Sequence, residues 1–403
     1  MTRTRIALLC ATSLIAPALQ TSAATAATVA DLRDAHRCVS SPHPAHGPGR
    51  QVLDIAERVK HDQDLNSVIL RVTKDGREVV TAALGESMTS VPAEPDMHFR
   101  AGSVAIAYMG TVLLQLADEH RISLDDTIDH WLPEVPHAHR ITLRMLGSST
   151  SGLRDYVTDP DFVAELEAHP FKHWTPEEVV GISTSHPLLY RPGTNWSYSH
   201  ANFQLLGAAL ERITDTPLDQ LLKERVMGPL GLHGTRNSYT PQIPSPVLHA
   251  FTSERGTYEE STFWNPSWTT APGAVITTQI CDLARSAEAI GSGELLSHHG
   301  YRELLDPGTV GLGTPTPDCP ASVCLPQTEE THYGTGVLVL NHWVAQNPSF
   351  SGYAAVQAYL PEEHLAIAVS TTEGPHTTEV NPAQTVAEEI SAALAPDHPL
   401  SFG

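Results

Sequence analysis

The sequence is poor in positive charge. Its 403 residues include 24 Lys and Arg against 46 Asp and Glu, so the formal net charge is −22. Nucleic acids and anionic membrane surfaces carry phosphate groups, and a strongly negative chain is repelled by them. We therefore expect neither of them as a partner.

Long apolar runs are missing beyond the start of the chain, where none approaches the ~18 residues of a membrane span. The start itself has Arg3 and Arg5, a short apolar run over residues 6–19, and small residues at 24–26. This order is typical of a secretory signal peptide. We predict a signal peptide over residues 1–26 and a secreted mature chain. Because cleavage removes the positive charges of Arg3 and Arg5, the net charge changes from −22 to near −24.

Cysteine is scarce. Cys10 lies in the early apolar run, which leaves four cysteines after cleavage. An even count in an oxidising compartment suggests disulfides. Cys319 and Cys324 enclose only the four residues PASV and form the expected pair. Cys38 with Cys281 then follows by elimination, the alternative being that both stay free and buried.

Strand patterns occur near both ends of the chain. The segments SVILRVT and REVVTAALG flank Lys74-Asp75-Gly76, and alternation around a DG turn predicts a hairpin. Three strand-like segments, THYGTGVLVL, GYAAVQAYLP and LAIAVSTT, come late in the chain. Helical patterns are expected at 51–60, at 103–119, and in DLARSAEAI and PAQTVAEEISAALA.

The middle of the chain, residues 122–266, is rich in helices, loops and proline and has no run of strands. The simplest architecture is an α+β fold, with an antiparallel sheet flanked by helices and a helical insertion lobe. Residues 51–100 and 272–400 would form the α/β lobe and residues 101–271 the helical lobe, after a flexible lead-in over 27–50. A cleft between two lobes is a natural ligand site.

Several segments carry a family resemblance. FRAGSV is followed by LLQLADEHRISLDDTIDHWLPE, SSTSGLRDY, PGTNWSYSHANFQLLGAALERITD, WTTAPGAVITT and GYAAVQAYLPEEHLAIAV. In content and order they resemble the serine β-lactamase and penicillin-binding protein family, in particular its class C β-lactamase and D-alanyl-D-alanine carboxypeptidase branch. The resemblance covers almost the whole mature chain. It implies the serine β-lactamase/DD-peptidase fold and a reaction without a cofactor.

The resemblance implies three catalytic elements, and all three are altered here. The first is Ser-x-x-Lys at a helix N-terminus, where residues three apart share one helix face. Ser103 keeps the nucleophile, but Ile106 replaces the lysine. The second is Tyr-x-Asn, in which Tyr198 is kept and His200 replaces the asparagine.

The third element is a triplet ending in glycine on the edge strand. Counting back from Gly352-Tyr353 places it at Gln346-Asn347-Pro348. Proline in place of glycine removes a backbone donor and fixes φ. Ser149 also replaces the family's histidine before Thr-Ser-Gly. Trp268 is expected near the cleft, where it either lines the cleft or simply packs.

Histidine is abundant, with 22 residues. Three close pairs suggest a metal site at first sight: His137 with His139, His169 with His173, and His298 with His299. None of them has a carboxylate or cysteine that would complete a ligand set, so we expect no metal.

Two interpretations of the altered elements remain open. In the first, acyl-serine catalysis is lost, and the protein is an exported pseudoenzyme whose cleft binds a small molecule or peptide such as a cell-wall peptide. In the second, His200 enters the space left by the lysine and acts as base for Ser103, with Tyr198 assisting, on an ester or amide. Both exclude ordinary β-lactamase or DD-peptidase turnover, and a monomer is the default for both.

Overall fold

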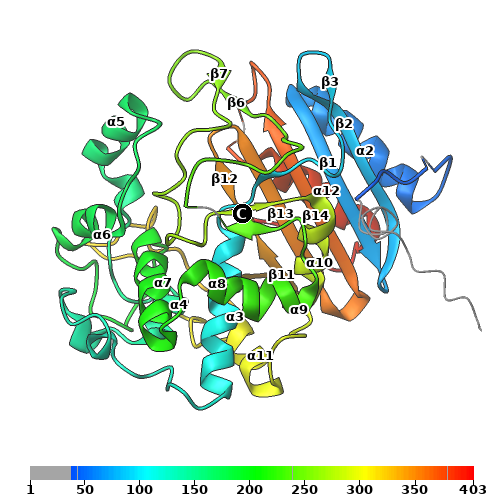
Figure 1. Ribbon diagram of the computed structural model, residues 1–403. Coiled ribbons are helices and arrows are strands. Elements are labelled where there is room, and N and C mark those ends of the chain that lie inside the picture. Colours follow the sequence, from blue (N-terminus) through cyan, green and yellow to red (C-terminus); the bar gives the residue numbers. More distant parts are fainter. Residues whose placement is uncertain (1–37, 43, 238, 379) are drawn as a thin grey trace, which may run out of the picture. The chain divides into compact units, whose positions relative to one another are not determined.

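The structure is a computed structural model that describes residues 38–403 except 43, 238 and 379 (Figure 1). The predicted signal peptide over residues 1–26 lies outside the described residues, as does the first part of the expected lead-in. No helix in the described part of the chain is long and apolar enough to cross a membrane.

A single large sheet contains strands from both ends of the chain, and all of its strand pairs are antiparallel. Within the described residues its strands, in sheet order, are β3 (Val91–Pro92), β2 (Arg77–Met88), β1 (Leu65–Lys74), β14 (Leu365–Glu373), β13 (Tyr353–Leu360), β11 (Trp343–Gln346), β10 (Leu338–Leu340) and β9 (Thr331–Tyr333), with β12 (Ser349–Phe350) paired to β13. The α+β fold class is therefore confirmed, since early strand β1 pairs directly with late strand β14.

The hairpin of β1 and β2 forms as predicted. Lys74 pairs with Arg77, and Asp75 and Gly76 between them both have positive φ, at 53° and 67°. Two such residues form the tight turn that matches the twist of paired strands. The late strand pattern is less regular than predicted, because THYGTGVLVL divides into β9 and β10.

The strand that carries the third element is not at the sheet edge. Strand β11 lies between β13 and β10, so the edge position implied by the resemblance is wrong for this chain. The strand stops at Gln346 and resumes as β12 at Ser349. Proline has no N–H to donate to a neighbouring strand, which explains the interruption at Asn347-Pro348.

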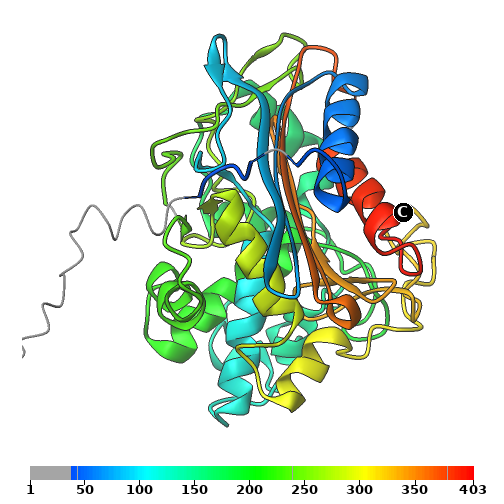
Figure 2. The same cartoon turned by 90° about the vertical axis from the view of Figure 1, so that its right-hand side faces the viewer.

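Helices cover both faces of the sheet (Figure 2). Helices α2 (Pro48–Asp62) and α12 (Pro382–Leu394) pack on one face, and α10 (Ile280–Gly291) packs on the other. Helix α2 begins three residues before the expected start at Gln51, because Pro48 suits the first turn, where the missing N–H is not needed. Residues 48–50 therefore belong to a helix and not to a flexible lead-in.

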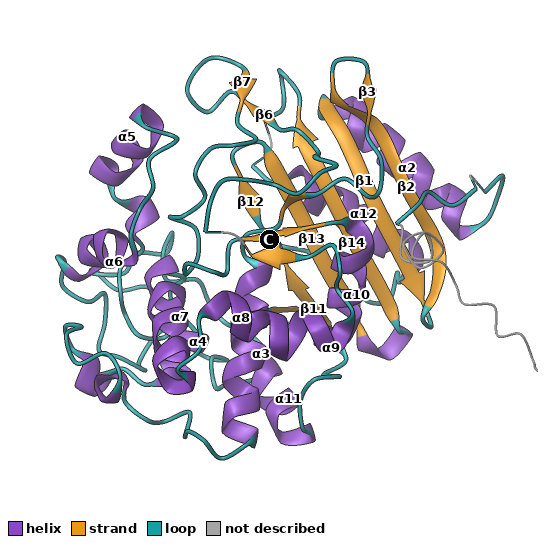
Figure 3. Ribbon diagram, viewed as in Figure 1, coloured by secondary structure: helices purple, strands orange, loops and turns teal. Residues whose placement is uncertain are grey.

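Helix α3 (Val104–Asp118) is apolar on nearly all sides and is buried beside the sheet. It packs against α11 (His298–Leu305) and α7 (His200–Thr214). The other helices of the middle segment gather beside the sheet (Figure 3): α4 (Leu143–Gly147), α5 (Pro160–Ala168), α6 (Pro176–Thr184), α8 (Leu218–Leu222) and α9 (Gly228–Leu230). The remaining short strands of the described part form two small sheets. One contains β4 (Phe99–Arg100), β8 (Ile276–Thr278) and β5 (Arg236–Asn237), and the other contains β6 (Phe251–Thr252) and β7 (Glu259–Glu260).

Both expected disulfides are present in the structure. Cys38 is bonded to Cys281, which ties the first described residue to α10 across 243 positions of the sequence. Cys319 is bonded to Cys324 and closes a short loop. The alternative that Cys38 and Cys281 stay free is thereby corrected.

Candidate active site

Ser103 stands at the N-terminus of α3 in a helical backbone conformation. The next three amides, of residues 104–106, donate to the carbonyl groups of residues 101–103. The N–H of Ser103 itself has no backbone acceptor among the described residues. A free N–H at a helix N-terminus favours negative charge, as on the oxygen of a carbonyl under attack.

Ile106 occupies the place where the family has lysine, and it is completely buried. Its side chain belongs to the large apolar core between the sheet and the helices. It does not line the cavity at Ser103. The position is therefore filled with hydrocarbon that can neither accept a proton nor carry charge.

Tyr198 lies beside Ser103 and is deeply buried around its phenol. Burial raises the pKa of Tyr198, the negative charge of Asp155 raises it further, and a hydrogen bond with the Ser103 side chain works in the opposite direction. The net effect keeps the phenol protonated at neutral pH. Tyr198 can donate a hydrogen bond at the site, but it is a poor base.

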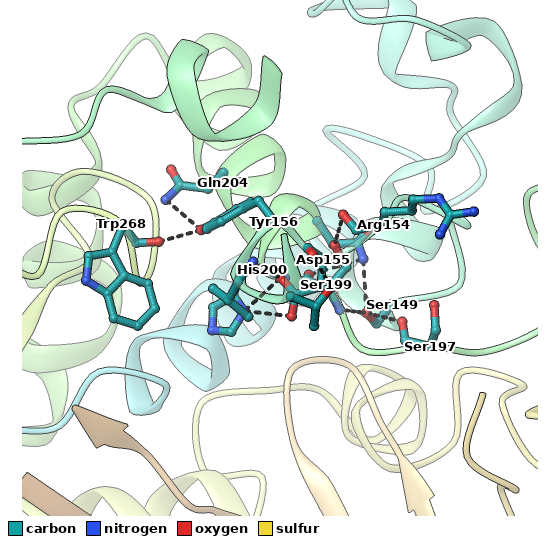
Figure 4. Close-up of polar contacts among 12 residues, drawn as sticks. Ser149, Arg154, Asp155, Tyr156, Ser197, Ser199, His200, Gln204 and Trp268 are labelled. Carbon is teal, nitrogen blue, oxygen red and sulfur yellow. Dashed lines mark hydrogen bonds and ion pairs between the residues drawn. The ribbon is translucent and has the colours of Figure 1, made fainter. Parts of the chain in front are cut away.

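His200 is the first residue of α7, and its imidazole is paired with a carboxylate (Figure 4). Its Nδ1 lies 3.1 Å from Oδ1 and 3.0 Å from Oδ2 of Asp155. Its backbone N–H also donates to Oδ1, at 3.2 Å. A carboxylate at Nδ1 favours the tautomer with the proton on that nitrogen. Nε2, which has no partner among the described residues, is then left as a base.

Asp155 is the functional candidate that the sequence did not reveal. It precedes a short 3₁₀ helix (Tyr156–Thr158) and also accepts a hydrogen bond from Val157 N, at 3.4 Å. The Tyr156 hydroxyl donates to the carbonyl oxygen of Trp268 (Figure 4). The only sequence signal for Asp155 is its place in SSTSGLRDY, one of the segments that carry the resemblance.

Ser149, which replaces the family's histidine, has a structural role. Its hydroxyl donates to the Ser197 carbonyl at 2.9 Å, and it accepts hydrogen bonds from Ser199 N at 3.1 Å and Asn202 Nδ2 at 3.0 Å. It therefore fixes the segment on which Tyr198 and His200 lie (Figure 4).

A cavity of about 380 Å³ brings the main candidates together. We call it the Ser103 cavity, and its lining residues are Ser103, Trp196, Tyr198, His200, Leu325, Pro326, Gln327, Thr331, His332, Tyr333, Leu338, Leu340, Gln346, Asn347, Ser349 and Phe402. Of the residues singled out in the sequence, it therefore unites Ser103, Tyr198, His200, Gln346 and Asn347.

Trp268 and Pro348 lie just outside this cavity. The Trp268 ring is 6.1 Å from the His200 ring between centroids. It lines a neighbouring cavity of about 520 Å³, which we call the Trp268 cavity and which shares Ser349 with the first. The Pro348 side chain faces Gly102, next to the nucleophile.

Three histidine pairs in the sequence raised the question of a metal site. Among the residues that the structure describes, no group of three or more His, Cys, Asp or Glu side chains is placed to hold an ion. His169 instead lies 3.9 Å from Glu165, just past the end of α5.

The chain matches known proteins over most of its length. A family model described as Beta-lactamase matches residues 53–390. A D-aminopeptidase of Brucella anthropi is 30% identical over 40% of this chain and 31% of its own length. A putative penicillin-binding protein, PbpX of Bacillus subtilis, is 23% identical over 60% of each chain. This chain thus spans only part of the curated relatives that it matches.

A solved structure agrees with this assignment at the level of the fold. A D-stereospecific amidohydrolase from a Streptomyces species superposes with a TM-score of 0.72 and 23% identity, over 88% of this chain and 99% of the other.

Proposed function

The chain belongs to the beta-lactamase family, and from that premise we propose that it is an exported acyl-serine hydrolase or acyltransferase whose base is His200. The observation that carries the proposal is the pairing of His200 Nδ1 with Asp155, at 3.0 Å, on the wall of a cavity that Ser103 also lines. A carboxylate that orients an imidazole beside a serine is the arrangement that activates a hydroxyl without a lysine.

The reaction follows from these groups. The Ser103 hydroxyl oxygen bonds to the carbonyl carbon of an ester or amide, and its proton passes to His200 Nε2. The bond to the leaving group then breaks, and the leaving group takes that proton. Water or an alcohol next bonds to the acyl carbon and gives its proton to Nε2. The bond between the acyl carbon and the Ser103 oxygen then breaks, and that oxygen takes the proton from Nε2, so that an acid or a new ester is released and both Ser103 and His200 are regenerated.

Tyr198 and the N-terminus of α3 supply hydrogen-bond donors that stabilise the negative charge developing during the reaction. Since its phenol stays protonated, Tyr198 serves as a hydrogen-bond donor in the site, and Asp155 serves as a positioning residue for His200. The Ser103 N–H supplies a donor for the developing oxyanion.

We propose that ordinary β-lactam and DD-peptide turnover is absent or very weak. Ile106 removes the amine of the first element, and Pro348 removes a backbone donor at the third. Export is supported by the sequence of the first 26 residues and by two disulfides, which persist in oxidising compartments. The monomeric state remains a prediction.

The names of two compared proteins support amide or ester cleavage as the reaction class. One is called a D-aminopeptidase and the other a D-stereospecific amidohydrolase.

A second candidate is a binding protein without catalysis, whose cleft holds a small molecule or peptide such as a cell-wall peptide. The buried hydrocarbon of Ile106 favours it, since the amine that serves the family's serine is gone. The two candidates differ in whether Ser103 forms a covalent adduct.

The decisive experiment is intact mass spectrometry of the mature protein after incubation with an alkyl fluorophosphonate and, separately, with a penicillin. We expect a fluorophosphonate adduct that is lost in Ser103→Ala and slowed at least about 100-fold in His200→Ala. His332→Asn is the matched control, because His332 lines the same cavity while both its ring nitrogens face backbone carbonyls.

The outcomes separate the candidates. No adduct in the wild type would favour the binding protein. Equal labelling of wild type and His200→Ala would remove His200 as base. Penicillin turnover that depends on Ser103 would contradict the proposed loss of β-lactamase activity.

A further inference from the structure

We infer that the acyl group of the substrate is uncharged and largely apolar, and that a terminal carboxylate is selected against. The inference rests on the proposed function and names the substrate class of the same site. An acyl group bonded to Ser103 must occupy the cavity that Ser103 lines, so the walls of the Ser103 cavity decide which acyl groups fit.

Apolar side chains form much of this wall. Leu338 and Leu340 come from β10, Leu325 and Pro326 follow the Cys319–Cys324 loop, and Phe402 comes from the end of the chain. Leu325 is 48% exposed. A ligand that covers it therefore removes apolar surface of both Leu325 and the ligand from water. Such burial stabilises a complex by about 25 cal/mol per Å² of apolar surface.

No described lining residue of the cavity is a lysine or an arginine. His332 cannot hydrogen-bond a ligand carboxylate, because its Nδ1 and Nε2 are both occupied, each 3.0 Å from a backbone carbonyl, of Thr328 and Leu305. The imidazole of His200 already faces the Asp155 carboxylate. A carboxylate in this cavity would lose water without meeting a lysine or arginine that could hydrogen-bond it, which is costly.

Neutral polar groups are available instead. Tyr333 lines the cavity, and its hydroxyl is fully buried near the Gln346 side chain without a hydrogen bond of normal geometry to a described residue. The side-chain nitrogen of Gln346 nearby is already committed to the Gly336 carbonyl, at 2.6 Å. A carbonyl or ether oxygen of a ligand that reaches this hydroxyl would give it the acceptor that it lacks.

The test compares two esters that differ in one group. p-Nitrophenyl hexanoate and mono-p-nitrophenyl adipate share the leaving group and a six-carbon acyl chain, but only the adipate ends in a carboxylate. We expect kcat/KM of the wild type to be at least tenfold higher for the hexanoate. A ratio below tenfold would overturn the inference.

Two further measurements make the result specific. Leu338→Lys places an amine on the wall and should reduce the hexanoate-to-adipate ratio at least tenfold, whereas the neutral control Leu338→Gln should not. Fluorophosphonate labelling of Ser103 is measured on the same samples. Labelling together with a preference for the adipate would refute only the acyl-group inference, whereas no labelling and no ester hydrolysis would refute the proposed function as well.

Discussion

Nδ1 of His200 lies 3.0 Å from Oδ2 of Asp155, although the two residues are 45 positions apart in the sequence. The two side chains are only 18% and 12% exposed, so water screens their interaction weakly. Pairing at Nδ1 leaves Nε2 as the nitrogen that can act on a hydroxyl, which is the role that the proposed function gives to the altered Tyr-x-Asn element.

The first prediction concerns Asp155→Asn. The amide keeps an oxygen for Val157 N and His200 N but removes the negative charge that fixes the imidazole tautomer. We expect the rate of Ser103 labelling by a fluorophosphonate to fall about 10²–10⁴-fold, with an unchanged circular dichroism spectrum.

The proton spectrum gives a second readout for this variant. A low-field resonance of the His200 Nδ1 proton, present in the wild type, should be lost in Asp155→Asn. A labelling rate equal to the wild type would mean that Asp155 has only a capping role.

The fold was largely predictable, because its signals are local. Alternating residues around Asp75-Gly76 specify a hairpin, and the apolar run after Ser103 specifies a buried helix. The resemblance then placed strands from both ends in one sheet. The interior position of β11 and the division into β9 and β10 depend on partners distant in sequence, so no local pattern revealed them.

The candidate site was predictable only in part. Ser103, Tyr198 and His200 follow from motif spacing, and the structure places all three on one cavity. Asp155 carries no signal of its own, because an aspartate before a short helix is also an ordinary cap. Only the tertiary fold brings it to His200.

The second prediction concerns Ile106→Lys, which restores the first element. The side chain at this position is fully buried, so an ammonium group there loses its hydration. We expect a loss of about 2–4 kcal/mol in the free energy of unfolding, measured by urea denaturation. Penicillin turnover should stay undetectable, because Pro348 and His200 still depart from the family pattern. A gain of turnover would show that the lysine alone was missing. Ile106→Met is the control of similar size.

The third prediction separates the roles of the two disulfides. Cys38–Cys281 closes a loop of 243 positions, and its removal in Cys38→Ala/Cys281→Ala should cost about 2–5 kcal/mol of unfolding free energy. Cys319–Cys324 spans five positions and should contribute less to stability.

The short disulfide should matter more for the site, since Leu325 and Pro326 directly follow it on the wall of the Ser103 cavity. We expect Cys319→Ala/Cys324→Ala to raise KM for p-nitrophenyl hexanoate at least threefold, and the long-range pair to leave KM unchanged. The reverse pattern of KM values would contradict this division.

The fourth prediction concerns pH and Glu373, which ends β14 and lines the Trp268 cavity. Burial raises the pKa of Glu373 from 4.5 to about 7, with a contribution from the charge of Glu254, while a hydrogen bond with Thr252 opposes the rise. A raised pKa means that the folded state binds this proton more tightly than the unfolded state does. Stability from this group is therefore present below about pH 4.5 and is lost as pH rises through about 7.

Glu373→Gln removes this dependence. Because the side chain is partly accessible to water, we expect a gain of only about 1 kcal/mol in unfolding free energy at pH 8, and little change at pH 5. Urea denaturation at the two pH values measures the difference, with the exposed Glu94→Gln as control. An equal effect of Glu373→Gln at both pH values would mean that the glutamate contributes through packing and not through its proton.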